Sequence, residues 1–245
     1  MNVLVTSSGY GLIETITGAM SIHSIKKSMT STFTDESGRT RTKYGTLKDH
    51  YTQKFGAGKN VSYSTAQMNF IRSLAGYSIA TYVLNLKDRH NGNILIDEEG
   101  HLVRMIPVRF PSNIKLDIDF GFFLSNSPGH GMGFEMSPFK LTADYLLLIG
   151  PHFPLFTQLL KAAFLSVRRH VDEICVLIEL LQKESNLPCF GLGDGTVAAF
   201  RARLKLELRD AEAESFVDVL IERSKGSAFT RGYDLYQALV HGIRP

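Results

Sequence analysis

Apolar side chains recur every three or four residues in the middle of the chain, the spacing that places them on one face of a helix. The positions with this spacing are Phe70, Ile71, Leu74, Ala75, Ser78, Ile79, Tyr82, Val83 and Leu86. Two short apolar runs follow at residues 94–96 and 101–103, and the polar stretch between them ends in Gly100. The pattern predicts one long amphipathic helix, then a strand, a turn and a second strand.

The second half of the chain has a helical pattern. Thr142 is placed to cap a helix that contains residues 145–149. Two apolar stripes that we interpret as core follow, made of Phe156, Leu159, Leu160, Ala163, Phe164 and Val167, and of Ile174, Leu177, Ile178 and Leu181. The last helices are expected near residues 198–208, 214–223 and 233–241, whereas residues 3–6 at the start of the chain predict one strand. The predicted fold class is therefore α+β, with helices dominating.

The candidate chemistry lies directly after the long helix. The hexapeptide Asp88-Arg89-His90-Asn91-Gly92-Asn93 is followed downstream by Asp119-Phe120-Gly121. In phosphoryl transfer, one carboxylate orients the attacking hydroxyl while an amide oxygen and a second carboxylate hold magnesium, and Asp88, Asn93 and Asp119 suit these roles. Asn91-Gly92 alone is equally typical of a hairpin turn between surface strands. The second motif is what favours a kinase site.

Several segments together resemble the type III phosphatidylinositol 4-kinases, nearest the beta form, over nearly the whole chain. The Asp-Arg-His order matches phosphatidylinositol 3- and 4-kinases, whereas protein kinases have His-Arg-Asp. The other segments that carry the resemblance are 19–27, Asn69-Phe70, 75–77, 133–135, 139–142 and 187–190. The resemblance implies the mostly helical C-terminal lobe of a protein-kinase-like fold, with a small β remnant of the N-terminal lobe.

The resemblance also implies roles for single residues. Asp88 resembles the catalytic-loop aspartate, Arg89 lies beside it in the same catalytic motif, and His90 resembles the histidine proposed to help deprotonate the inositol hydroxyl. A histidine beside a turn is, on its own, more often a structural hydrogen-bonding residue. Asn93 and Asp119 resemble the ligands of Mg²⁺ or Mn²⁺.

The expected nucleotide is ATP. Its adenine is expected to contact the backbone of the hinge segment, which comprises Glu14, Thr15 and Ile16.

The expected lipid substrate follows from the activation loop, residues 119–141. Kinases that accept more highly phosphorylated inositol lipids resemble one another in having a basic cluster there, since each phosphate pairs with Lys or Arg. This loop contains Lys140 and the weakly basic His130. Phosphatidylinositol is therefore the expected substrate, and the family resemblance implies phosphorylation at its 4-hydroxyl. A phosphatidylinositol 3-kinase and a non-catalytic interaction module are the alternatives.

Two departures from the family pattern affect the expected domains. Residues 1–16 supply the end of the small lobe and the hinge, and residues 17–245 the large lobe, with a mobile, insertion-like region at 28–64. Without an upstream phosphate loop and lysine, the chain is expected to be a nearly inactive fragment of an active enzyme. Residues 104–116 separate the predicted hairpin from Asp119, and we interpret them as a retained in-frame intron or an insertion.

Composition limits the possible partners. The net charge of +3 is too small to indicate nucleic acid, and 44% hydrophobic with 21% charged residues is ordinary for a globular protein. Cys175 and Cys189 are expected to be reduced thiols. No apolar run approaches the roughly 18 residues that span a bilayer. The expected location is cytoplasmic, peripheral on endomembranes, and Golgi-like by the family resemblance.

Overall fold

The computed structural model describes residues 3–7, 10–13, 17–35, 37–57, 60–87, 89–104, 124, 137–183, 185 and 188–243. The strands within these ranges are short and antiparallel: β1 (Val3–Ser7), β2 (Tyr10–Ile13), β3 (Met20–Ser21), β4 (Ser31–Thr34), β5 (Thr40–Lys43), β6 (Ile94–Ile96) and β7 (Leu102–Arg104). β1 pairs with β2, β4 pairs with β5, and β6 lies between β3 and β7 in a three-stranded sheet.

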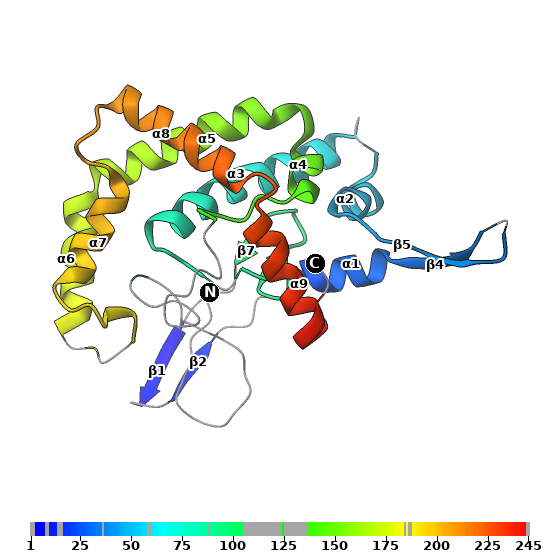
Figure 1. Ribbon diagram of the computed structural model, residues 1–245, viewed down its shortest axis with the longest axis horizontal. Coiled ribbons are helices and arrows are strands. Elements are labelled where there is room, and N and C mark those ends of the chain that lie inside the picture. The colour runs from blue at the N-terminus through cyan, green and yellow to red at the C-terminus, as the bar shows by residue number, and fades with distance from the viewer. Residues whose placement is uncertain are drawn as a thin grey trace.

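Helices form most of the body (Figure 1). They are α1 (Ile22–Met29), α2 (Leu47–Phe55), α3 (Val61–Val83), α4 (Ala143–Ile149), α5 (Phe153–Arg169), α6 (Val171–Lys183), α7 (Gly195–Leu204), α8 (Asp210–Ser224) and α9 (Ala228–His241), with short 3₁₀ turns η2 (Gly150–His152) and η3 (Pro188–Phe190). The predicted α+β class with a dominant helical part is confirmed. The strand expected at residues 3–6 and the three last helices are present, with bounds shifted by a few residues.

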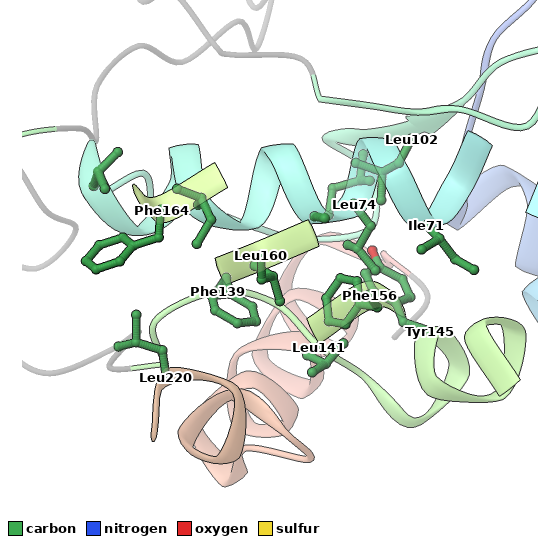
Figure 2. Close-up of a cluster of buried hydrophobic side chains, with 14 of the residues drawn as sticks. Ile71, Leu74, Leu102, Phe139, Leu141, Tyr145, Phe156, Leu160, Phe164 and Leu220 are labelled. Carbon is green, nitrogen blue, oxygen red and sulfur yellow. The ribbon is translucent and has the colours of Figure 1, made fainter. Parts of the chain in front are cut away.

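Helix α3 is the centre of the core and packs against α5, which in turn packs against α8. The predicted stripe on α3 is confirmed, since Phe70, Ile71 and Leu74 are buried together with most of its other members. Figure 2 shows side chains from α3, α5 and α8 meeting in one cluster, where Phe156, Leu160 and Phe164 of α5 are fully buried. This packing holds rigid the helix that leads to the predicted catalytic loop.

Helix α6 corrects one prediction. Of its expected core stripe, Ile178 is buried, but Leu177 and Leu181 are 59% and 63% exposed. The buried face instead runs through Val171, Cys175 and Ile178, because α6 packs against α7 along that single face. The predicted helical spacing is confirmed, and Ile174 and Ile178 do contact the core, but Leu177 and Leu181 were wrongly expected there.

The continuous stretch Ala143–Arg169 is long and apolar enough to cross a membrane by length and composition alone, with a mean hydropathy of 1.2 over 18 residues. By that measure the expectation that no segment approaches this size was wrong. Its apolar stripe on α5 packs against α3 and α8. Core packing accounts for only part of this hydropathy, because 22% of the 18-residue window is buried inside the protein.

The region 28–64 contains more regular structure than the expected loop. Its first part is the β4–β5 hairpin, which projects from the helical body (Figure 1). Its second part is helix α2, which Thr46 caps. Leu47 and Tyr51 of this helix are fully buried. The proposed insertion at 104–116 lies outside the described residues except for Arg104, so the retained-intron hypothesis stays a prediction.

Candidate active site

Residues 89–93 of the predicted catalytic loop lead into β6, and three of the five are buried although the segment forms no regular element. Arg89, Asn91 and Asn93 are 2%, 3% and 7% exposed. The Asn93 N–H donates to the His90 carbonyl at 3.0 Å, which closes a turn and turns the chain into β6. The hairpin alternative would have placed Asn91-Gly92 between two surface strands. Here helix α3 precedes the motif and a buried strand follows it.

The ring of His90 lies against Gly92. The Gly92 N–H donates to Nδ1 of His90 at 3.1 Å, so Nδ1 is unprotonated and the neutral ring carries its proton on Nε2. A Cβ at position 92 would lie 2.9 Å from Nδ1 and 3.0 Å from Cε1. Glycine is therefore required for this close approach, which sets both the position and the tautomer of His90.

Two distant segments hold the loop, residues 137–140 and helix α1. The Arg89 guanidinium donates to the Ser137 carbonyl at 2.8 Å, and Nζ of Lys140 donates to the Arg89 carbonyl at 3.0 Å. The N–H of His23, in the first turn of α1, donates to the Asn91 carbonyl at 3.0 Å. First-turn N–H groups have no partner inside their own helix, so this bond satisfies α1 and fixes the loop at once.

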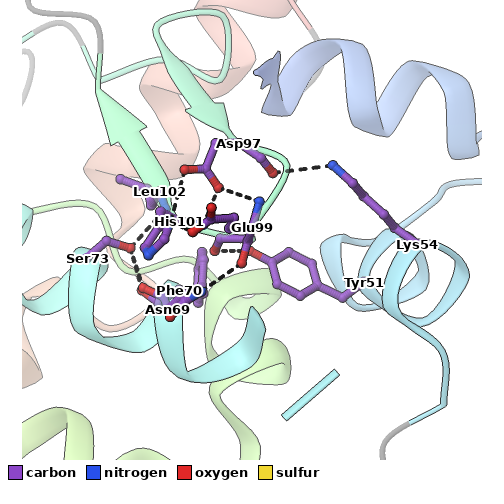
Figure 3. A network of polar contacts seen from close by, with 10 residues as sticks. Tyr51, Lys54, Asn69, Phe70, Ser73, Asp97, Glu99, His101 and Leu102 are labelled. Atoms are coloured by element: carbon purple, nitrogen blue, oxygen red, sulfur yellow. Dashed lines mark hydrogen bonds and ion pairs between the residues drawn. The ribbon is translucent and has the colours of Figure 1, made fainter. Parts of the chain in front are cut away.

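The β6–β7 hairpin, which continues from Asn93, is fixed by a polar network shown in Figure 3. The Tyr51 hydroxyl donates to the Gly100 carbonyl at 2.6 Å, and the Asn69 amide donates to the Glu99 carbonyl at 2.9 Å. Gly100 has φ of +85°, and a Cβ there would lie 2.9 Å from Cβ of Ala66. The predicted strand, turn and strand are thus confirmed, and α2 and α3 hold the turn.

Tyr51 acts in this network as a neutral donor. Burial, reinforced by the nearby Asp97 carboxylate, raises the pKa of its hydroxyl well above the ordinary value. Asp97 itself accepts the N–H of Glu99 at 2.9 Å and the N–H of His101 at 2.8 Å. The raised pKa keeps the Tyr51 hydroxyl protonated, and so a donor to the Gly100 carbonyl, at neutral pH.

The predicted site residues divide into two groups. Arg89, His90 and Asn93 lie together in the described loop. Asp88, Asp119 and the hinge residues Glu14, Thr15 and Ile16 lie outside the described residues. Their proposed roles stay predictions.

Sequence reasoning missed the partner of the loop's lysine. Lys140 was considered as a charge in the activation loop, but its Nζ lies 2.6 Å from Oδ1 of Asp234 on α9. The two residues are 94 positions apart, so no local spacing indicates the pair. An acidic residue on a C-terminal helix gives no signal of this kind by itself.

A family model described as "Phosphatidylinositol 3- and 4-kinase" matches residues 1–191. The chain belongs to the phosphatidylinositol 3- and 4-kinase family. The match covers the catalytic loop, so the family resemblance drawn from the Asp-Arg-His order is confirmed.

Members of this family with curated names show how much of such a protein the chain spans. It is 46% identical over 247 residues to phosphatidylinositol 4-kinase pik1 of Schizosaccharomyces pombe, covering 99% of this chain and 27% of that protein. It is 41% identical over 250 residues to phosphatidylinositol 4-kinase beta 2 of Arabidopsis thaliana, covering 99% and 20%. Phosphatidylinositol 4-kinase beta of Xenopus tropicalis is 34% identical over 245 residues, covering 98% and 27%. The chain thus spans about a quarter of the length of these phosphatidylinositol kinases.

Proposed function

We propose that the protein containing this chain transfers the γ-phosphate of ATP to the 4-hydroxyl of phosphatidylinositol. The observation that carries the proposal is the buried loop 89–93, held between α3 and β6 with the side chains that the family motif prescribes. Membership of the family and the printed names of its relatives support the substrate. Two alternatives remain: the protein is a phosphatidylinositol 3-kinase, or it is a non-catalytic interaction module.

The proposed roles start from Asp88, which would orient and deprotonate the inositol hydroxyl. Asn93 and Asp119 would hold Mg²⁺ or Mn²⁺, because amide and carboxylate oxygens are the ligands these hard cations prefer. When bound, the ion neutralises charge on the nucleotide phosphates. Asn93 fits this assignment, since it is 93% buried at the entrance to β6 and its backbone is fixed by the turn. Residues 14–16 would contact adenine.

His90 receives a different role from the one that the resemblance implied. Its Nδ1 is occupied by the Gly92 N–H, so the neutral ring has a proton to donate at Nε2 and no lone pair there to act as a base. We therefore assign His90 as a hydrogen-bond donor to a phosphate or inositol oxygen. Asp88 remains the proposed proton acceptor.

The structure strengthens the argument for an unphosphorylated headgroup. Lys140 is 5% exposed, and its charge is paired with Asp234 inside the protein. A lysine in that position does not present its charge to a phosphate on the inositol ring. The remaining basic side chain of the predicted activation loop is His130. Phosphatidylinositol without added phosphates therefore suits the loop better than its phosphorylated forms.

The location that accompanies this function is also a proposal. By family resemblance, we infer a cytoplasmic enzyme that works peripherally on endomembranes such as the Golgi. The mildly positive net charge of +3 is compatible with an anionic membrane surface.

The test is transfer of labelled phosphate from ATP to vesicles that contain phosphatidylinositol or its 4-phosphate, with the product's ring position determined. The protein is expressed from its whole transcript. We expect a 4-phosphate product from the first lipid and little turnover of the second. A 3-phosphate product would favour the competing enzyme, and no transfer in the presence of Mg²⁺ and Mn²⁺ would favour the non-catalytic module.

The same assay tests the role of His90. Glutamine offers an N–H donor near the position of Nε2 but no basic nitrogen, so His90→Gln should retain roughly a tenth of the activity, whereas His90→Ala should lose about 10²-fold or more. Equal losses in the two variants would restore the general-base role.

A further inference from the structure

The buried ion pair between Lys140 and Asp234 adjoins the loop 89–93 at the Arg89 carbonyl. The two side chains are 4% and 9% exposed, and Nζ and Oδ1 are 2.6 Å apart. Burying two charges costs several kcal/mol per ion in general, and the mutual attraction recovers this only with good geometry and further hydrogen bonds. Lys140 supplies one of these bonds by donating to the Arg89 carbonyl at 3.0 Å.

Arg89 and the segment 137–140 are joined by two hydrogen bonds, one donated from each side. Lys140 donates to the backbone of Arg89, and the Arg89 side chain donates to the backbone of Ser137 at 2.8 Å. The segment is itself tied to the end of α8, where the Phe139 N–H donates to Oγ of Ser224 at 3.3 Å. Position 89 is thus linked to α8 and α9 through Lys140 and its neighbours.

The chemistry of the buried ion pair indicates that its role is to fix the position of the loop, not to increase the free energy of unfolding. Apolar residues of similar volume often replace a buried ion pair at no cost in stability. A carbonyl in a loop without regular structure, however, requires a fixed donor, and an apolar side chain provides none. The Arg89 carbonyl is one peptide unit from the proposed base Asp88 and adjoins His90, so any shift there moves both.

We propose that Lys140 and Asp234 are positioning residues, which hold the catalytic loop at the Arg89 carbonyl so that Asp88 and His90 keep their reactive geometry. The proposal rests on the proposed kinase function for its activity readout. Asp234 fixes the direction of the lysine head, and the lysine fixes the loop. Both side chains are buried, so their proposed action is through the loop and not through contact with substrate.

The experiment compares four variants of the whole expressed protein: Asp234→Asn, Lys140→Met, the double variant K140M/D234L, and the control Asp218→Asn. Asp218 pairs with Lys161 at 2.8 Å, but on the surface between α8 and α5, so the control removes an ion pair that does not reach the loop. Three quantities are measured: kcat and the KM for ATP with phosphatidylinositol vesicles, the thermal unfolding midpoint, and hydrogen exchange at the amides of Gly92 and Asn93.

We expect Asp234→Asn and Lys140→Met to lower kcat by about 10- to 100-fold with little change in the KM for ATP, since misplacement by about 1 Å costs rate on this scale. The double variant should recover the unfolding midpoint but not kcat. Exchange at Gly92 and Asn93 should accelerate in all three and stay unchanged in Asp218→Asn. Recovery of kcat together with stability in the double variant would overturn the proposal.

Hydrogen exchange separates this proposal from the proposed function. If the unaltered protein transfers no phosphate to phosphatidylinositol, the kinase proposal fails, and the exchange rates alone decide whether the pair positions the loop. Faster exchange at Gly92 and Asn93 in Asp234→Asn, but not in Asp218→Asn, supports it. Equal exchange in the two variants overturns it.

Discussion

The predicted catalytic loop, residues 89–93, and the β4–β5 hairpin differ in what holds their shape. The loop residues 89–93 form no regular element, yet Arg89, Asn91 and Asn93 are buried and bonded to α1 and to residues 137–140. The hairpin has four regular antiparallel pairs, yet all eight of its strand residues are exposed. Regular backbone pairing therefore does not by itself show that a segment is integrated into the fold.

The hairpin's polar contacts support this distinction, because they stay inside it. The Asp35 carboxylate accepts the N–H groups of Ser37 and Arg39 and pairs with Arg41 at 2.5 Å. These bonds, led by the one from the Ser37 hydroxyl, lower the pKa of Asp35 to about 2. The hairpin is organised locally, whereas the loop depends on residues that are distant in sequence.

The largest expected contrast comes from one arginine in each region. Arg89→Leu removes a buried, charge-assisted bond to Ser137 and should lower the free energy of unfolding by about 1.5–3 kcal/mol. Arg41→Leu removes an exposed, solvent-screened ion pair and should lower the free energy of unfolding far less. Urea unfolding of both variants measures the difference. Equal losses would mean that the loop is no better integrated than the hairpin.

Gly92→Ala tests the loop with the smallest possible change. The added methyl would meet the His90 ring at 2.9 Å, so the ring must move and its bond to the Gly92 N–H weakens. We expect phosphate transfer to fall about tenfold, equivalent to about 1.4 kcal/mol in the activation barrier. Gly76→Ala on α3 is the matched control, because a Cβ there meets nothing within 4 Å. A similar loss of activity in the control would contradict the argument.

Sequence patterns predicted those parts of the molecule in which periodicity is local. The helix α3, the β6–β7 hairpin and the Thr142 cap could all be predicted, since each depends on residues within one or two turns of each other. The motif also placed Arg89, His90 and Asn93 in one loop.

The patterns did not predict what depends on tertiary contacts. The exposed Leu177 and Leu181 follow helical spacing as well as buried residues do, because only packing decides which face is covered. The pairing of Lys140 with Asp234, and the bond from His23 to Asn91, join residues separated by 94 and 68 positions. No periodicity reaches across such separations.

Shortening the hairpin should have a smaller effect than either substitution in the loop. Thr32 and Thr42 lie opposite each other, so residues 33–41 can be replaced by Asn-Gly, which favours a two-residue turn. We expect the free energy of unfolding to change by less than about 0.5 kcal/mol, as is usual for surface changes. Calorimetry of the shortened protein checks this, and a loss of several kcal/mol would show that the hairpin supports the body.

His50, on the helix that follows the hairpin, should give the smallest effect. Burial, followed by the nearby Lys54, lowers the pKa of its imidazole below the ordinary value. His50 therefore binds a proton more readily in the unfolded chain than in the folded protein. The free energy of unfolding should fall as pH drops through the ordinary histidine range. His50→Gln should flatten this dependence between pH 7.5 and 5.5 in urea unfolding. The exposed His170→Gln serves as control, and an unchanged slope in His50→Gln would place the acid sensitivity elsewhere.

The serine on α3 beside the three-stranded sheet has a consequence for solubility. Oγ of Ser73 accepts the N–H of Leu102 at 2.9 Å, and β7 is the outer strand of that sheet. Exposed strand edges offer free N–H groups to which the strands of other molecules add, a common route to aggregation. The bond occupies one of these donors, and α3 lies where an added strand would begin. The helix that leads to the predicted catalytic loop thus also covers part of the β7 edge, which disfavours the addition of another strand there.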